Sequence, residues 1–98
     1  MTSTINSIRS ARGMYLHLQT HPYSQKVSIS YSLLKDSGVE LSIYNQEGKK
    51  MNTLLQDHQK SGKHTMDWDS SKLENGIYFL YLRGSGRQLV KRMRVINI

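Results

Sequence analysis

The sequence predicts an all-β domain, either a sandwich or a barrel of short strands. Apolar and polar residues alternate with a period of two in several segments, which recur at intervals of about ten residues. Valine, isoleucine, threonine and tyrosine are plentiful and alanine is scarce, as is typical of strands. Glycines and other turn-forming residues separate the alternating segments. No helical period continues for three turns, so we expect strands throughout.

The first half of the domain follows a polar leader. Residues 1–13 show no apolar period and predict a flexible linker, so we expect the folded domain to span 14–98. The clearest strand is 27–33, in which four apolar residues alternate with three serines. Turns are expected at 35–38 and 45–48, both of which end in glycine. The strands expected in this half are 14–18, 27–33, 39–44 and 51–55.

The second half contains the most apolar strand. Residues 57–62 predict a polar loop, after which His64, Met66 and Trp68 share one face of a strand. The run 77–82 is apolar and aromatic on both faces, which is typical of a central strand. The remaining expected elements are a connection at 69–76, a glycine-rich hairpin loop at 83–87 and a closing strand at 89–98.

The apolar positions of these strands define the expected core. In the closing strand, Met93 and Val95 are expected to face inward, with Arg92 and Arg94 outward. Trp68 is expected to be the largest core residue and mostly buried. The tyrosines are expected to pack in the sandwich with their hydroxyls at the rim. The predicted core consists of Val27, Ile29, Leu33, Val39, Leu41, Ile43, Leu54, Met66, Trp68, Leu73, Ile77, Phe79, Met93 and Val95.

Length and composition exclude several classes of protein. A chain of 98 residues has room for one core. It contains no cysteine, which excludes disulfides and thiolate metal sites. No apolar stretch approaches the roughly 20 residues of a membrane-spanning helix. The first ten residues are polar and lack the apolar segment of a secretory signal, so the signal of an exported protein would lie outside this chain.

A series of motifs in the second half resembles a known family. In order, these are SGKHTMDWD at 61–69, a leucine at 73, NGIYF at 75–79 and KRM at 91–93. The series is similar to the C-terminal sorting domain of proteins exported by the type IX secretion system of Bacteroidetes and their relatives. The first half agrees with the family's second and third strands, so the resemblance covers 14–98. The residues that match the family's motifs are Trp68, Asp69, Leu73, Gly76, Tyr78 and Met93.

The resemblance implies an immunoglobulin-like antiparallel β-sandwich of about seven strands. It also implies a non-catalytic sorting signal, without cofactor, that takes a fused upstream cargo through the periplasm to the outer-membrane translocon. The cargo would reach the cell surface or the exterior after a sortase-like peptidase cuts in the upstream linker. A similar module occurs in flagellar hook-capping proteins, so a structural role in a surface assembly is the alternative.

Histidines and aspartates in the second half raise the question of a metal site. The stretch from Asp67 has neither the glycine at the sixth position nor the glutamate at the twelfth that an EF-hand loop requires. Asp67 and Asp69 flank Trp68 and leave the face that buries it, whereas His64 lies on that inner face. His58 is isolated in the expected polar loop. We therefore expect no metal ion.

A catalytic site is not indicated either. No serine lies in a Gly-x-Ser-x-Gly elbow, and there is no cysteine nucleophile. The seven carboxylates are scattered through turns, so no acid–base pair can be nominated from their spacing.

The net charge of +7 is concentrated towards the C-terminus. No acidic residue follows Glu74, and the last hairpin is rich in arginine and lysine. This basic surface indicates an anionic partner, either a protein or an anionic glycolipid. Nucleic acid is the less favoured alternative, because the nearby tyrosines lie in an apolar run and are expected to pack in the core. The candidate partner-binding residues are Arg87, Lys91, Arg92 and Arg94.

Overall fold

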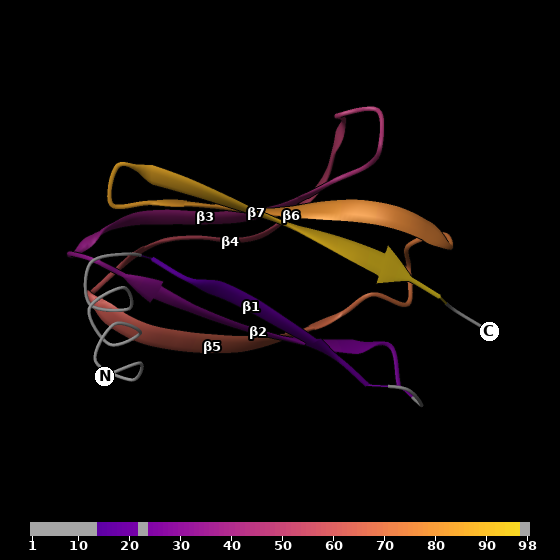
Figure 1. Cartoon of the computed structure of the whole chain (residues 1–98), viewed down its shortest axis with the longest axis horizontal. Helices are drawn as coiled ribbons and strands as arrows, with labels where there is room; N and C mark the ends of the chain where they lie inside the picture. Colours follow the sequence, from indigo (N-terminus) through magenta and orange to yellow (C-terminus); the bar gives the residue numbers. More distant parts are fainter. Residues whose placement is uncertain (1–13, 22–23, 97–98) are drawn as a thin grey trace, which may run out of the picture.

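Seven strands make up the described part of the chain. The structure, a computed structural model, describes residues 14–21 and 24–96. Two antiparallel sheets face each other as a sandwich (Figure 1), which confirms the predicted fold class. The linker expected at 1–13 lies outside the described residues. The strands are β1 (Leu16–Thr20), β2 (Lys26–Leu33), β3 (Ser37–Tyr44), β4 (Lys50–Gln59), β5 (Gly62–Asp69), β6 (Gly76–Gly84) and β7 (Arg87–Val95).

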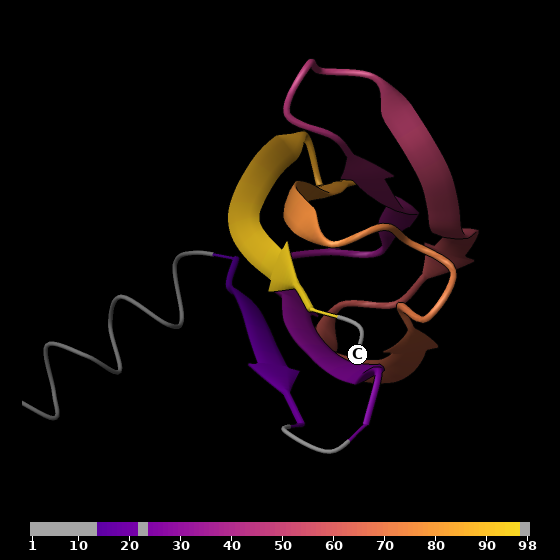
Figure 2. The same ribbon diagram turned by 90° about the vertical axis from the view of Figure 1, so that its right-hand side faces the viewer.

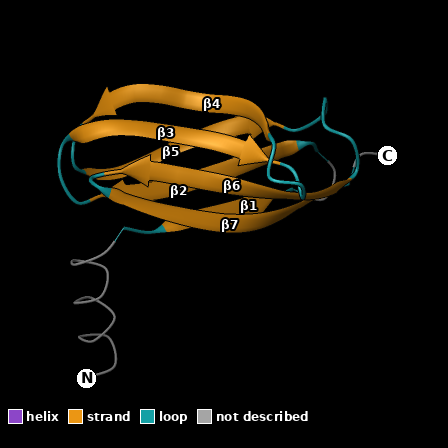
Figure 3. Cartoon of the chain, turned by 90° about the horizontal axis from the view of Figure 1, so that it is seen from above, coloured by secondary structure: helices purple, strands orange, loops and turns teal. Residues whose placement is uncertain are grey.

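The strand order resembles that of a constant-type immunoglobulin domain, except that β4 belongs to the other sheet. One sheet has the order β1-β2-β5 and the other β4-β3-β6-β7, and all neighbours are antiparallel (Figure 3). In constant-type immunoglobulin domains the fourth strand pairs with the fifth, whereas here β4 pairs with β3. Strands β3 and β6 are therefore central in the larger sheet. Strand β7 lies at its edge, beside β1 of the other sheet (Figure 2).

Alternation in β2 places its apolar residues inside, as predicted. Val27, Ile29, Tyr31 and Leu33 are each at most 4% exposed, while the serines between them are half-buried on the outer side. Strand β2 pairs with β1 on one side and β5 on the other, so its backbone hydrogen bonds are satisfied on both edges. Burial and pairing together make β2 the centre of the three-stranded sheet.

The core agrees with the prediction at most positions. The predicted residues that are fully buried are Val27, Ile29, Leu33, Val39, Leu41, Ile43, Met93 and Val95. Leu54, Met66, Trp68 and Leu73 are half-buried and pack against this cluster. The prediction is wrong for Ile77 and Phe79, which are half-buried and outside the core cluster. The core positions that were not in the predicted set are Leu16, Tyr31, Tyr78, Leu80 and Leu82.

The error in β6 concerns which face points inward. Its buried residues are Tyr78, Leu80 and Leu82, whereas Ile77, Phe79 and Tyr81 are half-buried on the other side. Because the run is apolar on both faces, alternation alone could not choose between them. Pairing decides the face, since Leu80 lies opposite Ile43 of β3, which is completely buried.

Tyr31, and not Trp68, is the largest fully buried side chain. Trp68 is only half-buried because β5 is an edge strand of its sheet, although it packs against the core. The ring of Tyr31 stacks on His64 with 5.3 Å between ring centroids, and its hydroxyl donates a hydrogen bond to the side-chain oxygen of Gln59. Burial raises the pKa of Tyr31.

Strand β4 extends beyond the predicted 51–55 at both ends, so the loop expected at 57–62 is wrong. Its pairing with β3 contains register shifts, one of which leaves Leu54 as an extra residue. Such a bulge breaks the period of two, and Leu54 and Leu55 are both half-buried as a result. The prediction missed Lys50 and 56–59, which are polar and mostly exposed and therefore show no apolar alternation.

The turn between β6 and β7 is tighter than the loop predicted at 83–87. Only Ser85 and Gly86 separate the strands, with φ angles of 52° and 72°. Two positive φ angles are the mark of a type I′ hairpin turn, whose twist matches that of the strands. The Ser85 N–H donates to Ser37 Oγ at 2.9 Å and its hydroxyl donates to the Lys35 carbonyl at 3.1 Å. These bonds tie the turn to the β2–β3 connection.

Candidate partner-binding surface

Strand β7 carries the four basic residues predicted to bind a partner, but it presents them on two sides. Arg92 and Arg94 are exposed on the outer face of the four-stranded sheet. Arg87 and Lys91 share the opposite side of the strand with Met93, and both are exposed at the sheet edge. Strand alternation therefore divides the predicted set into two pairs, of which only Arg92 and Arg94 lie on the open sheet face.

The outer face of the four-stranded sheet is apolar and aromatic next to these arginines. On β6, Ile77 lies opposite Arg94 and Phe79 lies opposite Arg92. Val90 lies on the same side of β7 as Arg92 and Arg94, opposite Tyr81, and is 43% exposed. We call this surface the aromatic–basic face, and its residues are Tyr44, Lys50, Ile77, Phe79, Tyr81, Arg83, Val90, Arg92 and Arg94.

Two tyrosines and an arginine form a cluster on the aromatic–basic face. The rings of Tyr44 and Tyr81 have centroids 4.5 Å apart and planes tilted by 57°. The guanidinium of Arg83 lies 5.7 Å and 5.2 Å from these two centroids and donates to the Tyr44 hydroxyl at 3.3 Å. Ser42 faces outward from β3 between them, yet it is completely buried. The neighbouring side chains therefore lie along the sheet and cover it.

A single carboxylate, Glu40, faces outward among the described residues of this sheet's β3, β6 and β7, and it is already paired. Its Oε2 accepts from Lys50 Nζ at 2.7 Å and from the Ser42 hydroxyl at 2.5 Å, with Arg83 at 3.7 Å. The bond from Lys50 and then the bond from Ser42 lower the pKa of Glu40. Glu40 in turn raises the pKa of Lys50. Arg92 and Arg94 form no ion pair within the described part of the chain.

The residues that match the family motifs hold the connection between β5 and β6. Asp69 Oδ1 accepts from the backbone N–H of Ser71 at 2.9 Å, which lowers the pKa of Asp69. Leu73 packs against the core from within the connection. The hydroxyl of Tyr78 donates to the carbonyl of Glu74 at 2.8 Å, which closes the connection onto the start of β6.

The last motif positions lie in β6 and β7. Gly76 begins β6 with a φ of 159°, close to extended backbone, and a Cβ there would make an ordinary contact of 3.8 Å with the ring of Tyr78. Met93 is 4% exposed and lies opposite Tyr78 in the β6–β7 ladder. Like Trp68, Met93 contributes to the packing of the sandwich.

Comparison with known families agrees with this arrangement. Residues 21–96 match the secretion system C-terminal sorting domain. The chain belongs to this family. The match contains all of β2 to β7, so it covers the sandwich and not a single motif. Such a domain is a C-terminal sorting signal for cargo of type IX secretion. A search of curated proteins found no match.

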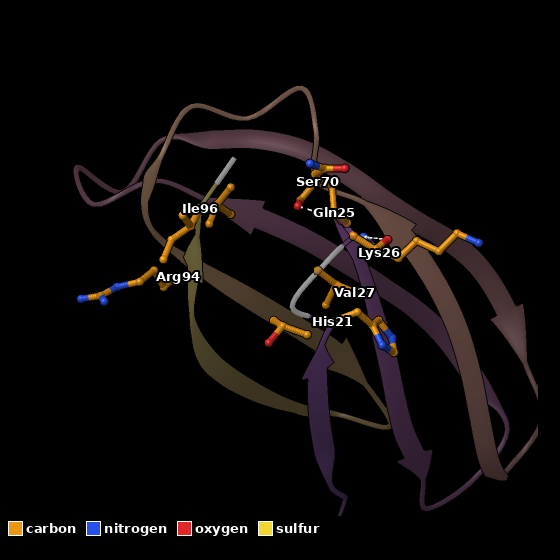
Figure 4. Close-up of a pocket in the computed structure, with 10 residues that line it drawn as sticks. His21, Gln25, Lys26, Val27, Ser70, Arg94 and Ile96 are labelled. Carbon is orange, nitrogen blue, oxygen red and sulfur yellow. Dashed lines mark hydrogen bonds between the residues drawn. The ribbon is translucent and has the colours of Figure 1, made fainter. Parts of the chain in front are cut away.

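A pocket lies at one end of the sandwich, among the described residues of the sorting domain. Its volume is about 500 Å³, and it lies between the start of β2 and the end of β7. Lys26 and Arg94 line it, but both side chains extend away from the pocket in opposite directions (Figure 4). Val27, Val95 and Ile96 provide apolar walls. The pocket therefore does not focus positive charge on a ligand.

Three hydrogen-bonded side chains cross the outer face of the three-stranded sheet. His21 Nε2 lies 3.1 Å from Ser28 Oγ, which donates to Asp67 Oδ1 at 3.1 Å. In a Ser-His-Asp triad the histidine lies between the other two residues and takes the serine proton. Here the serine is the middle residue and directs its hydroxyl to the aspartate. In the described part of the sorting domain, no three histidine or carboxylate side chains gather as a metal site requires, and no helix could cross a membrane.

Reasoning from sequence missed the aromatic–basic face because it assigned Ile77 and Phe79 to the core. The signal was nevertheless present in the apolar run of β6. A central strand that is apolar on both sides can cover only one side with the opposite sheet of a two-layer sandwich. The other side must be covered by neighbouring side chains or by a partner.

Proposed function

We propose that this sorting domain delivers a cargo protein, fused upstream of it, to the outer-membrane translocon of the type IX machinery. The domain acts by being recognised and does no chemistry of its own. The cargo crosses the periplasm in transit and reaches the cell surface or the exterior. A sortase-like peptidase then separates cargo and domain by cutting in the upstream linker.

The match of residues 21–96 to the sorting-domain family carries this proposal. Because the match contains six consecutive strands, the machinery has a folded surface to recognise, assembled from positions far apart in the chain. Binding of this kind needs complementary shape and charge and requires no cofactor.

We also propose that the basic residues of β7 take part in recognition: Arg87, Lys91, Arg92 and Arg94. Their exposure and their position on an edge strand support this role. An edge strand has unpaired main-chain groups on one side, to which a partner can add a strand. Exposed positive charges also increase the rate of encounter with a negatively charged partner.

A fusion experiment tests the sorting function. A reporter that normally remains in the periplasm is joined upstream of the whole chain and expressed in a type IX-competent host. Reporter on the surface of intact cells is expected in this host, and retention in the periplasm is expected in a matched host without the translocon. Reporter that stays in the periplasm of the competent host, with a domain that resists proteolysis, contradicts the proposal and favours a purely structural module of a surface or hook-capping assembly.

A further inference from the structure

We propose that the aromatic–basic face is a docking surface for an acidic protein with apolar side chains among its carboxylates. The inference rests on the proposed sorting function, since it places this partner in the secretion machinery. It goes beyond that function by assigning recognition to a sheet face built from β3, β6 and β7 and the first residue of β4.

The centre of the aromatic–basic face is apolar where a solvated sheet face is usually polar. Val90 is 43% exposed, and Ile77 and Phe79 are only half-buried. The outer face of the three-stranded sheet offers a comparison within the same molecule. The corresponding central positions there are Ser28 and Ser30 of β2. An apolar surface of this kind on one sheet alone is typical of an interaction site.

Cations surround this apolar centre. Arg92 lies opposite Phe79 and Arg94 opposite Ile77, and neither arginine has an ion-pair partner among the described residues. Lys50 and Arg83 lie at the far side, where they share the one carboxylate, Glu40. Arginine and tyrosine around an apolar centre are the residues enriched at protein contacts.

Charge and size favour a transient acidic partner over a second copy of the chain. A second copy would bring a surface of the same sign to a chain with net charge +7. The nine residues of the face, each occupying roughly 4.8 Å by 7 Å of the sheet, cover only about 300 Å². A stable dimer buries about 800 Å² on each partner. A small, charge-steered contact suits a signal that must be captured and then released.

The tyrosine cluster disfavours nucleic acid as the occupant. Single-stranded nucleic acid binds through flat stacking of bases on open aromatic rings. Here the rings of Tyr44 and Tyr81 are tilted by 57°, and the guanidinium of Arg83 lies over both. One face of each ring is therefore covered within the domain itself, and the tilt prevents the two rings from forming a flat stacking surface.

A binding titration tests the inference. The probe is a fluorescent random copolymer of glutamate and tyrosine, and its anisotropy is followed as the whole chain is added. The double substitution Arg92→Ser and Arg94→Ser is expected to weaken binding about tenfold, which corresponds to the loss of two exposed charge contacts. The matched control is Lys26→Ser with Lys63→Ser, which removes two exposed cations from the outer face of the other sheet and is expected to change binding less than about twofold.

The apolar part of the inference has its own comparison. The parent is expected to bind the glutamate–tyrosine copolymer more tightly than polyglutamate of equal charge, and Val90→Ser is expected to remove this preference. Equal losses in the two double variants would show that only net charge matters and would overturn the assignment of the face. Tighter binding of oligothymidylate or phosphatidylglycerol vesicles, with the same dependence on Arg92 and Arg94, would overturn the choice of an acidic protein.

The docking inference and the sorting function can fail separately. If the Arg92 and Arg94 double variant loses copolymer binding but is still delivered to the surface at the parental level, the docking inference is overturned and the sorting function stands. If the parental fusion is never delivered, the sorting function is overturned whatever the copolymer titration shows.

Discussion

The two sheets bury apolar residues in the same way on their inner faces, but their outer faces differ in chemistry. On the three-stranded sheet, β2 presents serines, and Ser28 is held in a chain of hydrogen bonds with His21 and Asp67. On the four-stranded sheet, β6 presents Ile77, Phe79 and Tyr81. Alternation fills the core equally well in both cases. The contrast shows that packing of the core does not determine which residues occupy the outward positions. An apolar outer face therefore needs an explanation other than folding.

The largest expected effect compares the two sides of β6. Leu80→Ala should lower the free energy of unfolding by about 2–5 kcal/mol, because Leu80 is completely buried and its removal leaves a cavity. Phe79→Ser should cost clearly less, since Phe79 is half-buried on the outer face. Urea denaturation of both variants measures the difference. A larger loss for Phe79→Ser than for Leu80→Ala would reverse the assignment of the two faces.

The next effect concerns the edge of the three-stranded sheet. Trp68→Ala should cost about 2 kcal/mol, less than the roughly 3–5 kcal/mol of a fully buried tryptophan, because Trp68 is half-buried on edge strand β5. Trp68 is the chain's one tryptophan, so native fluorescence reports on it alone. Partial quenching by acrylamide is expected. Fluorescence as strongly quenched as that of the unfolded chain would contradict the packing of Trp68 against the core.

A smaller effect is expected at the turn that joins β6 to the arginine-bearing strand. Gly86→Ala should destabilise the domain by about 1 kcal/mol, because an L-residue with a side chain is strained at a φ of 72°. A Cβ at Gly86 would meet no atom within 4 Å, so the loss would come from the backbone and not from a clash. Thermal unfolding measures it. The matched control is Gly38→Ala, which has open space and no positive φ and should change the melting temperature little.

The smallest effect is the pH dependence contributed by Glu40 on the aromatic–basic face. Its pKa is lowered in the folded state, so its stabilising contribution is present above the ordinary value of 4.5 and is lost as the pH falls through the lowered pKa. The pair with Lys50 is partly exposed, so we expect only a few tenths of a kcal/mol. We therefore expect the free energy of unfolding to fall slightly more steeply in the parent than in Glu40→Gln as the pH is lowered from 6 to 3, roughly the range in which such a carboxylate titrates. Unfolding curves at several pH values measure this difference. Identical pH profiles would show that the pair contributes nothing measurable.

Much of the candidate site could be predicted because it depends on strand alternation. The prediction that Arg92 and Arg94 face outward while Met93 and Val95 face inward is confirmed. Alternation also separates Lys91 from Arg92, although the sequence places them side by side. The tyrosine and arginine cluster could not be predicted, because Tyr44 and Tyr81 belong to strands whose register only tertiary pairing sets.

The sequence by itself determined the number and order of the strands, the inner residues of β2, β3 and β7, and the membership of the sorting-domain family. Each of these depends on local periodicity or on motifs that stand close together in the chain. Only the tertiary structure decided which face of β6 is buried and where the bulge in β4 interrupts its pattern. A run that is apolar on both faces carries no local information about its inner side, and a bulge removes the period on which the local reading depends. Contacts with neighbouring strands supply what the local pattern lacks, and they also create the aromatic–basic face.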